Sequence, residues 1–173
     1  MIERVETRRM VLERLRMEHL DELSRLLRDP RVAATGWPGG MPPSERDVLI
    51  SLADKERHWE RYGFGMWLMR DRASGEMVGR GGLQWTFYVR DLDEVEVGWS
   101  VVPERWGEGL ATELAVASVD VGFGPLDLDR IVAFTTPDNA ASRRVMEKAG
   151  FAYDRDMLHV GLPHVLYGLR RTR

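Results

Sequence analysis

Two alternating glycines, Gly107 and Gly109, lie between a strand-like run at 94–102 and a helix-forming run at 111–123. Without side chains at these two positions, a ligand can approach the backbone closely. The N–H groups at the start of a helix lack intrahelical partners and lie at the positive end of the helix dipole, so they bind anions. A strand, a glycine-spaced turn and a helix therefore predict a site for a diphosphate-bearing ligand, although an ordinary turn with two glycines remains an alternative.

Three known phosphate-binding patterns place glycines at a turn of this kind. A P-loop would end in Gly-Lys-Ser/Thr, which the chain lacks. A dinucleotide fingerprint would need a third glycine at Thr112 and an acid after the next strand, whereas Asp127 and Asp129 precede that strand. The pattern Gln/Arg-x-x-Gly-x-Gly/Ala does match residues 106–111, with Trp106 in the first position.

This third pattern resembles the pyrophosphate loop of the GNAT acyltransferases. The sequence Trp-Gly-x-Gly-Leu-Ala-Thr is similar to the form in the RimJ/RimL-like ribosomal-protein N-acetyltransferase branch. Residues 7–13 are similar to the first strand of that branch, Thr-x-Arg-Leu-x-Leu-Arg, with Glu13 in place of the last arginine. The resemblance implies acetyl-CoA as acyl donor, bound by the loop residues Trp106, Gly107, Glu108, Gly109, Leu110, Ala111 and Thr112.

A second segment, residues 139–151, resembles the family's other signature, Asn-x-x-Ser-x-x-x-x-x-Lys-x-Gly-Phe. Asn139 is a good N-cap and Gly150 a good residue to end a helix, so helix capping alone also explains these two positions. The resemblance implies that Asn139 binds the pantetheine amide. Ser142 is expected one turn into this helix, where its hydroxyl could reach the sulfur of CoA, so it is the favoured general acid for the departing thiolate. Tyr153 is the competing candidate for the acid, close to where many members of the family have a tyrosine. The alternative for Ser142 is a purely structural role as the N3 partner of Asn139.

Composition limits the class of protein. The 173 residues fit one domain spanning 1–173, with a net charge of −3 that predicts no broad nucleic-acid surface. No apolar run reaches the roughly 20 residues of a membrane helix, and the N-terminal residues do not have the pattern of a secretory signal. Cysteine is absent, which excludes disulfides and a cysteine nucleophile. These features predict a cytoplasmic protein without a membrane partner, and a homodimer stays open.

The order of expected elements predicts an α+β fold, a mixed and mostly antiparallel sheet flanked by helices. Asp29-Pro30 is expected to stop the first helix, Ser44 with Asp47 to cap the second, and residues 91–93 to form a turn. The resemblance implies that strands 94–102 and 130–135 are parallel and splay apart around the pantetheine arm. The expected elements are strands at 7–14, 64–70, 77–87, 94–102, 130–135, 151–156 and 165–170, and helices at 17–27, 44–62, 111–123 and between Asn139 and Gly150.

Acetyl transfer to an amine also requires groups that position the thioester and remove a proton. The backbone of Val101 and Val102 is expected to pair with the pantetheine and the acetyl carbonyl. Glu94 and Glu96 are two residues apart on one face of their strand, and Glu96-Val97-Gly98-Trp99 resembles the family's Glu-Ile-Gly-Tyr segment. Glu96 is therefore the first candidate for the base and Glu94 the second. The alternative is that both are solvated carboxylates on an exposed face.

The function expected from these residues is acyl transfer from acetyl-CoA to a primary amine by direct attack in a ternary complex. The acceptor would be a protein N-terminus or a small amine, since the branch includes both. The alternative is a sensory module that binds acyl-CoA without turnover. The four histidines are dispersed, and although His159 and His164 could meet across a turn, no acid or cysteine completes a metal site.

Overall fold

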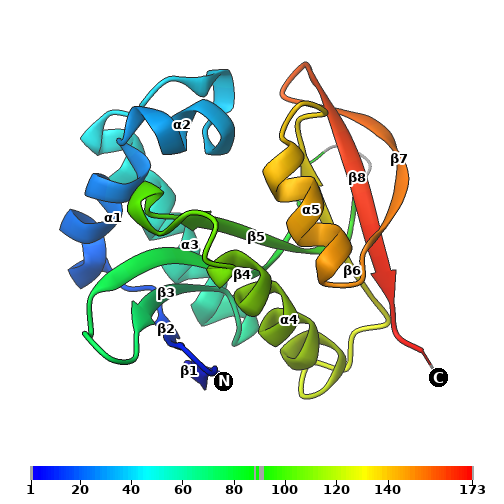
Figure 1. The fold of residues 1–173 in the computed structure, drawn as a ribbon, viewed down its shortest axis with the longest axis horizontal. Coiled ribbons are helices and arrows are strands. Elements are labelled where there is room, and N and C mark those ends of the chain that lie inside the picture. Colours follow the sequence, from blue (N-terminus) through cyan, green and yellow to red (C-terminus); the bar gives the residue numbers. More distant parts are fainter. Residues whose placement is uncertain (1, 88, 90–91, 173) are drawn as a thin grey trace.

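A computed structural model describes residues 2–87, 89 and 92–172 of the chain (Figure 1). Its strands are β1 Arg4–Glu6, β2 Met10–Arg14, β3 Met66–Asp71, β4 Met77–Trp85, β5 Val95–Val101, β6 Arg130–Thr135, β7 Ala152–His159 and β8 Leu162–Arg170. Its α-helices are α1 Leu20–Leu27, α2 Pro30–Gly36, α3 Glu45–Tyr62, α4 Leu110–Phe123 and α5 Ala140–Lys148. Short 3-10 turns, η1 Met17–His19, η2 Pro38–Gly40 and η3 Pro103–Arg105, lie between them.

The strands form one eight-stranded sheet in the order β1-β2-β3-β4-β5-β6-β8-β7. Strands β1 to β5 are an antiparallel meander, β5 and β6 are parallel, and β8 is antiparallel to both β6 and β7. This arrangement confirms the α+β class and the parallel pair expected at the centre of the sheet. Strand β6 has the bounds expected from the sequence.

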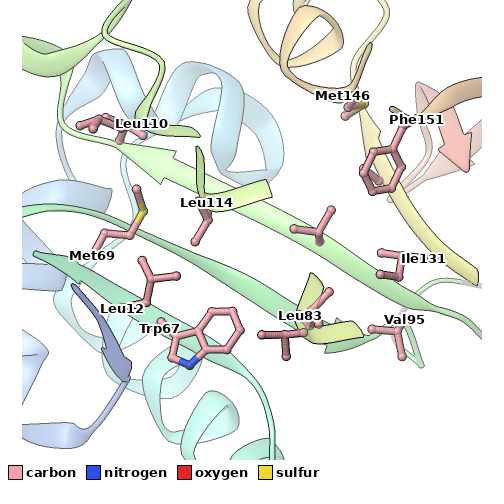
Figure 2. Close-up of a cluster of buried hydrophobic side chains, with 14 of the residues drawn as sticks. Leu12, Trp67, Met69, Leu83, Val95, Leu110, Leu114, Ile131, Met146 and Phe151 are labelled. Atoms are coloured by element: carbon pink, nitrogen blue, oxygen red, sulfur yellow. The ribbon is translucent and has the colours of Figure 1, made fainter. Parts of the chain in front are cut away.

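Helices cover both faces of the sheet. Leu110 and Leu114 of α4 pack on strand residues of one face, together with Met146 and Phe151 around α5 (Figure 2). Helices α1, α2 and α3 enclose a second cluster on the opposite face. Strand β3 contributes to both clusters in alternation, since Trp67 and Met69 face the first and Met66 and Leu68 the second. Both faces of the central strands are therefore buried, and the side chains near β5 have little access to water.

Helix α2 was not expected from the sequence. Asp29-Pro30 was expected to stop the chain's first helix, and α1 does end at Leu27, but Pro30 also begins α2. Proline at the first helical position has a suitable φ and needs no N–H partner. Asp29 caps this helix, because its side chain accepts a hydrogen bond from the N–H of Arg31 at 2.9 Å. Strand β1 was also missed, since three residues give too short a pattern.

Helix α3 begins and ends as its sequence predicts. The Ser44 side chain accepts a hydrogen bond from the N–H of Asp47, and the Asp47 carboxylate accepts one from the N–H of Ser44, which confirms the capping box. The helix ends at Tyr62, and Gly63 caps it with a φ of 73°, in the left-handed region. The turn expected at 91–93 falls partly on Asp91, which lies outside the described residues.

His58 of α3 connects this helix to strand β4. The N–H of Trp85 donates to Nε2 of His58 at 3.0 Å, so Nδ1 carries the ring hydrogen and donates to the Phe64 carbonyl at 2.9 Å. Burial lowers the pKa of His58 below its ordinary value, and the nearby Lys55 lowers it further. The neutral ring is therefore the form that the fold requires.

We predict that the free energy of unfolding falls as the pH drops below about 6.5. In that range His58 binds a proton in the unfolded chain but stays neutral in the folded protein, which favours the unfolded state. Urea unfolding measured between pH 5 and 7.5 tests this. His58→Gln should lose this part of the pH dependence and keep the part due to His159, whose pKa is also lowered by burial. Equal slopes for wild type and variant would show that His58 does not contribute.

Candidate active site

Strands β5 and β6 pair through one residue pair, Glu96 with Val132, within the described part of the chain. The N–H of Val102 donates to Val78 and the N–H of Thr86 to Glu94, both at 3.0 Å, so the even-numbered residues of β5 hydrogen-bond to β4. The N–H and C=O groups of Trp99 and Val101 consequently point the other way, toward β6. Because β6 no longer pairs there, these groups face the unpaired interval between the two strands, which is called the gap below.

The two valines at the end of β5 differ in what their backbone can offer a ligand. Both backbone groups of Val102 have partners in the fold, since its N–H donates to Val78 and its C=O accepts from the N–H of Arg105 at 3.0 Å. The C=O of Val101 accepts from Nε1 of Trp106 at 2.8 Å. The gap-facing groups are thus those of Val101 and Trp99, and the bond from Trp106 holds the following loop against the end of β5.

The glycine loop requires glycine at both positions that the sequence singled out. Gly107 and Gly109 each have a φ of 82°, a conformation that side-chain-bearing residues rarely adopt. Gly109 is the N-cap of α4, and the first intrahelical bond runs from Glu113 N–H to its carbonyl at 3.1 Å. The N–H groups of Leu110, Ala111 and Thr112 therefore have no intrahelical partner and point out of the helix start. A Cβ on Gly107 would meet nothing within 4 Å.

The charged side chains of the loop are paired with one another. The Glu108 carboxylate accepts from Nε of Arg105 at 2.7 Å, and Arg105 also pairs with Asp71 at 3.0 Å. The hydrogen bond from Arg105, together with those from the N–H groups of Ser74 and Ala73, holds the pKa of Asp71 below its usual range. Because the carboxylate of Glu108 is paired in this way, attraction for an anion comes mainly from the backbone N–H groups and the helix dipole.

A polar brace, formed by Thr7, Arg9 and Glu113, fixes the start of α4 to the chain just before β2. Glu113 accepts hydrogen bonds from the Thr7 hydroxyl, the Arg9 N–H and Nε of Arg9, each at 2.7 Å. Arg9 also donates to the carbonyl of Glu108 at 2.7 Å, inside the glycine loop. Burial alone would raise the pKa of Glu113, but the bonds from Thr7 and Arg9 outweigh it and lower the pKa. The sequence signal for this brace was the Thr-x-Arg segment, which gave no indication of its partner.

The two candidate bases have different surroundings, and neither is a solvated carboxylate. Glu96 is only 6% exposed, so the alternative of an exposed acidic face was wrong. Its carboxylate accepts a hydrogen bond from Nε2 of Gln84, which in turn accepts one from Nζ of Lys55. Glu94 is half-buried and pairs with Arg130 at 2.9 Å. Helix α3 and strand β4 thus enclose Glu96, which the sequence pattern of β5 by itself could not show.

The second signature forms the start of helix α5. Asn139 caps the helix by accepting from the Ser142 N–H at 3.1 Å, and its amide donates to the Thr135 hydroxyl at 2.9 Å. Tyr153 lies on β7, which β6 and β8 separate from β5. Tyr153 is 55% exposed, and its hydroxyl donates to Asp156 at 3.0 Å, which raises the pKa of the phenol. The structure thus brings Asn139 and Ser142 to the C-terminal end of β6 and leaves Tyr153 at the sheet edge.

The histidines and the helices were also considered in the sequence, for metal binding and for membrane spanning. The rings of His159 and His164 lie 5.3 Å apart, as expected from their spacing, and Phe134 packs against both. Within residues 2–87, 89 and 92–172, no three His, Asp or Glu side chains are grouped so that they could hold a metal ion. None of the helices in this described part is long and apolar enough to span a bilayer.

Comparisons with known proteins agree with this geometry. The family described as "Acetyltransferase (GNAT) domain" matches residues 9–152. YoaA, an uncharacterized N-acetyltransferase of Bacillus subtilis, is 26% identical over 147 residues, which are 85% of this chain and 81% of YoaA. The uncharacterized protein YkkB of the same organism is 30% identical over 112 residues, which are 65% of this chain and 64% of YkkB.

Solved structures share the whole fold. A putative GNAT-family acetyltransferase from Bordetella pertussis superposes with a TM-score of 0.82 at 27% identity, covering 95% of this chain and 98% of that one. RimL, a ribosomal L7/L12 alpha-N-protein acetyltransferase solved with coenzyme A, superposes with a TM-score of 0.77 at 17% identity, covering 97% and 98%. The chain belongs to the GNAT acetyltransferase family and is an N-acetyltransferase. The reaction of this family is acyl transfer from acetyl-CoA.

The brace predicts an effect on donor binding. Glu113→Gln removes the charge that holds Arg9 against the glycine loop, so affinity for acetyl-CoA should fall roughly 10-fold, as expected for a lost charge-assisted hydrogen bond. Isothermal titration calorimetry with acetyl-CoA measures it. Glu147→Gln is the control, because Glu147 is an exposed residue of α5, and this variant should bind acetyl-CoA as wild type does. Unchanged affinity in Glu113→Gln would mean that the loop keeps its shape without the brace.

Proposed function

We propose that this enzyme transfers the acetyl group of acetyl-CoA to a primary amine by direct attack within a ternary complex. The observation that carries the proposal is the glycine loop at the start of α4, immediately beside the unpaired backbone at the end of β5. One element offers N–H groups to a diphosphate, and the other offers a strand edge to an extended amide-bearing arm. A protein N-terminus, the acceptor for which RimL is named, and a small amine are the two acceptor classes proposed.

The residues of the loop suit a coenzyme A diphosphate. The N–H groups of residues 110–112 point out of the helix start, and the absence of Cβ atoms at Gly107 and Gly109 leaves their backbone accessible. The gap-facing groups of Trp99 and Val101 would hold the pantetheine amides, a role we now assign to Val101 rather than Val102. Asn139 can still take part, because its amide oxygen and nitrogen each retain one bonding position.

Catalysis would depend mainly on positioning, since the thioester is already activated. Holding the acetyl group and amine together in the best-aligned cases contributes as much as ~7–11 kcal/mol. The Val101 N–H would stabilise charge on the acetyl oxygen. Glu96 would remove the proton from the attacking amine, directly or through a water molecule. We favour Glu96 over Glu94 because the Glu94 carboxylate already accepts a hydrogen bond from Arg130.

Protonation of the departing thiolate is the second proton transfer. We favour Ser142 for this role, because it lies in the first turn of α5, next to the end of β6. Tyr153 is disfavoured, because it lies three strands from β5, roughly 14 Å at the usual strand spacing. Its hydroxyl proton is also engaged with Asp156.

The loop assignment is tested by Gly109→Glu, which adds both bulk and negative charge where the diphosphate would bind. Acetyl-CoA binding measured by calorimetry should be lost. Gly75→Glu is a matched control, because Gly75 also has a left-handed backbone (φ 74°) with open space around it, but lies in the β3–β4 turn. The control should bind normally. Normal binding by Gly109→Glu would refute the loop as the donor site.

Direct attack predicts sequential kinetics. The chain has no cysteine to form an acetyl-enzyme intermediate, so double-reciprocal plots should intersect. Acceptors must first be found by screening peptides with free N-termini, polyamines and aminoglycosides. Parallel lines, or an acetylated protein detected by mass spectrometry before acceptor is added, would exclude this mechanism.

The acid–base assignment predicts different pH behaviour for two variants. Glu96→Gln should lower kcat by roughly 10²–10⁴-fold, with partial recovery at high pH where the amine arrives deprotonated. Ser142→Ala should lower kcat without that recovery, because its task is to protonate the thiolate. Acetyl-CoA affinity should hardly change in Glu96→Gln. If Glu96→Gln retains wild-type kcat at neutral pH, another group or bulk water removes the proton.

A further inference from the structure

Lys55 is half-buried on the side of helix α3 that faces the sheet. The buried side chains that α3 turns toward the sheet are Val48, Leu52 and Trp59, each with 0% exposure. Lys55 falls in the same stripe, three residues after Leu52 and four before Trp59, where a helix of this kind ordinarily carries an apolar residue. Lysine is rarely buried without a partner. Its side chain points toward strand β4, where it meets Gln84.

A directed chain of hydrogen bonds runs from Lys55 to Glu96. An ammonium group can only donate and an ionised carboxylate can only accept, so both neighbours fix the orientation of the Gln84 amide. Its oxygen accepts from Lys55 and its nitrogen donates to Glu96. Gln84 and Glu96 are opposite one another in the β4–β5 register and are 5% and 6% exposed. The Gln84 amide thus connects an element of the outer layer to the proposed base.

Within the described residues, charged side chains on α3, β4, β5 and β6 lie around this chain of hydrogen bonds. Lys55 is on α3, and Arg80 is four residues before Gln84 on β4 and interacts electrostatically with Lys55. On β5, Glu94 is turned to Arg130. Burial, and secondly Arg80, lower the pKa of Lys55 to about 8, while Glu96 and Asp54 act in the opposite direction. The Lys55 ammonium and the Glu96 carboxylate therefore stabilise each other's charged forms.

We propose that Lys55 is a positioning residue for Glu96. Acting through Gln84, it keeps the Glu96 carboxylate oriented and ionised at the start of the gap. Lys55 thereby sets the pH above which Glu96 is ionised and can act as the base. This inference rests on the proposed function, in which Glu96 is that base. Packing alone does not require a cation at this position, because a methionine of similar length would fill the same space on α3. Replacing buried ions with apolar groups is also often neutral for stability.

The charge state of Glu96 can be measured without an acceptor. In protein carrying 13C-labelled glutamate, the side-chain carboxyl signal of Glu96 is identified by its loss in Glu96→Gln and followed against pH. Lys55→Gln, which keeps an N–H donor and removes the charge, should move the titration midpoint of Glu96 upward by about one pH unit. Lys55→Arg should leave it near the wild-type value. Arg46→Gln, at the exposed start of the same helix, is the control and should not change it.

Activity provides the second readout. With an acceptor from the screen, the acid limb of the kcat/KM profile should move upward in Lys55→Gln by the same amount, and acetyl-CoA affinity should stay unchanged. If Lys55→Gln does not fold, Gln84→Leu interrupts the same chain and should raise the midpoint in the same direction. An unchanged Glu96 midpoint overturns the inference. Full activity of Glu96→Gln would instead overturn the proposed role of Glu96 as the base. The titration of Glu96 would still decide whether Lys55 controls its charge.

Discussion

The central constraint in this structure is that β5 and β6 are adjacent, but in the part of the chain that the structure describes they pair at a single position. Past Glu96 and Val132, the backbone groups on one edge of β5 have no strand to bond. Unmet N–H and C=O groups in a protein interior cost free energy, so they need other partners. The Trp106 indole supplies one of them, at the carbonyl of Val101. The remaining edge is available to an extended molecule, and the glycine loop begins where that edge ends.

The other contacts keep this interrupted region in shape from opposite sides. The brace of Thr7, Arg9 and Glu113 joins the loop to the N-terminal part of the chain, across more than 100 positions of sequence. The chain from Lys55 through Gln84 reaches Glu96 from the other face of the sheet. Both are polar, buried or half-buried and directional, so they fix orientation in a way that apolar packing alone does not.

Features encoded by local sequence were predictable. The caps at Ser44 and Asn139 each depend on a few neighbouring residues, and the bounds of β6 follow from an apolar run between turn residues. The family's two motifs gave the fold and the loop, because their glycine and asparagine requirements are local too. In these segments, the residues that would bind the ligand are the same residues that determine the backbone conformation.

Features that depend on distant partners were not predictable. The alternation in β5 placed Glu94 and Glu96 on one face, but their partners come from elsewhere in the chain. Glu96 is enclosed by Lys55 of α3 and Gln84 of β4, and Glu94 pairs with Arg130 of β6. Likewise, Thr7 and Arg9 matched a family segment without revealing Glu113 as their partner. Pro30 was misjudged for a different reason: proline ends a helix that precedes it and begins one that follows, and only the Asp29 cap selects the second.

The two outer strands of the sheet determine how the molecule behaves beside other copies of itself. At one border, β1 has only three residues and offers few free backbone groups. At the other, β7 is longer but carries Asp154, Arg155 and Asp156 in succession, and its register with β8 shifts between Tyr153 and Arg155. Charges and an irregular register oppose the addition of a further strand. An open sheet of this size is thereby protected against edge-to-edge aggregation at high concentration.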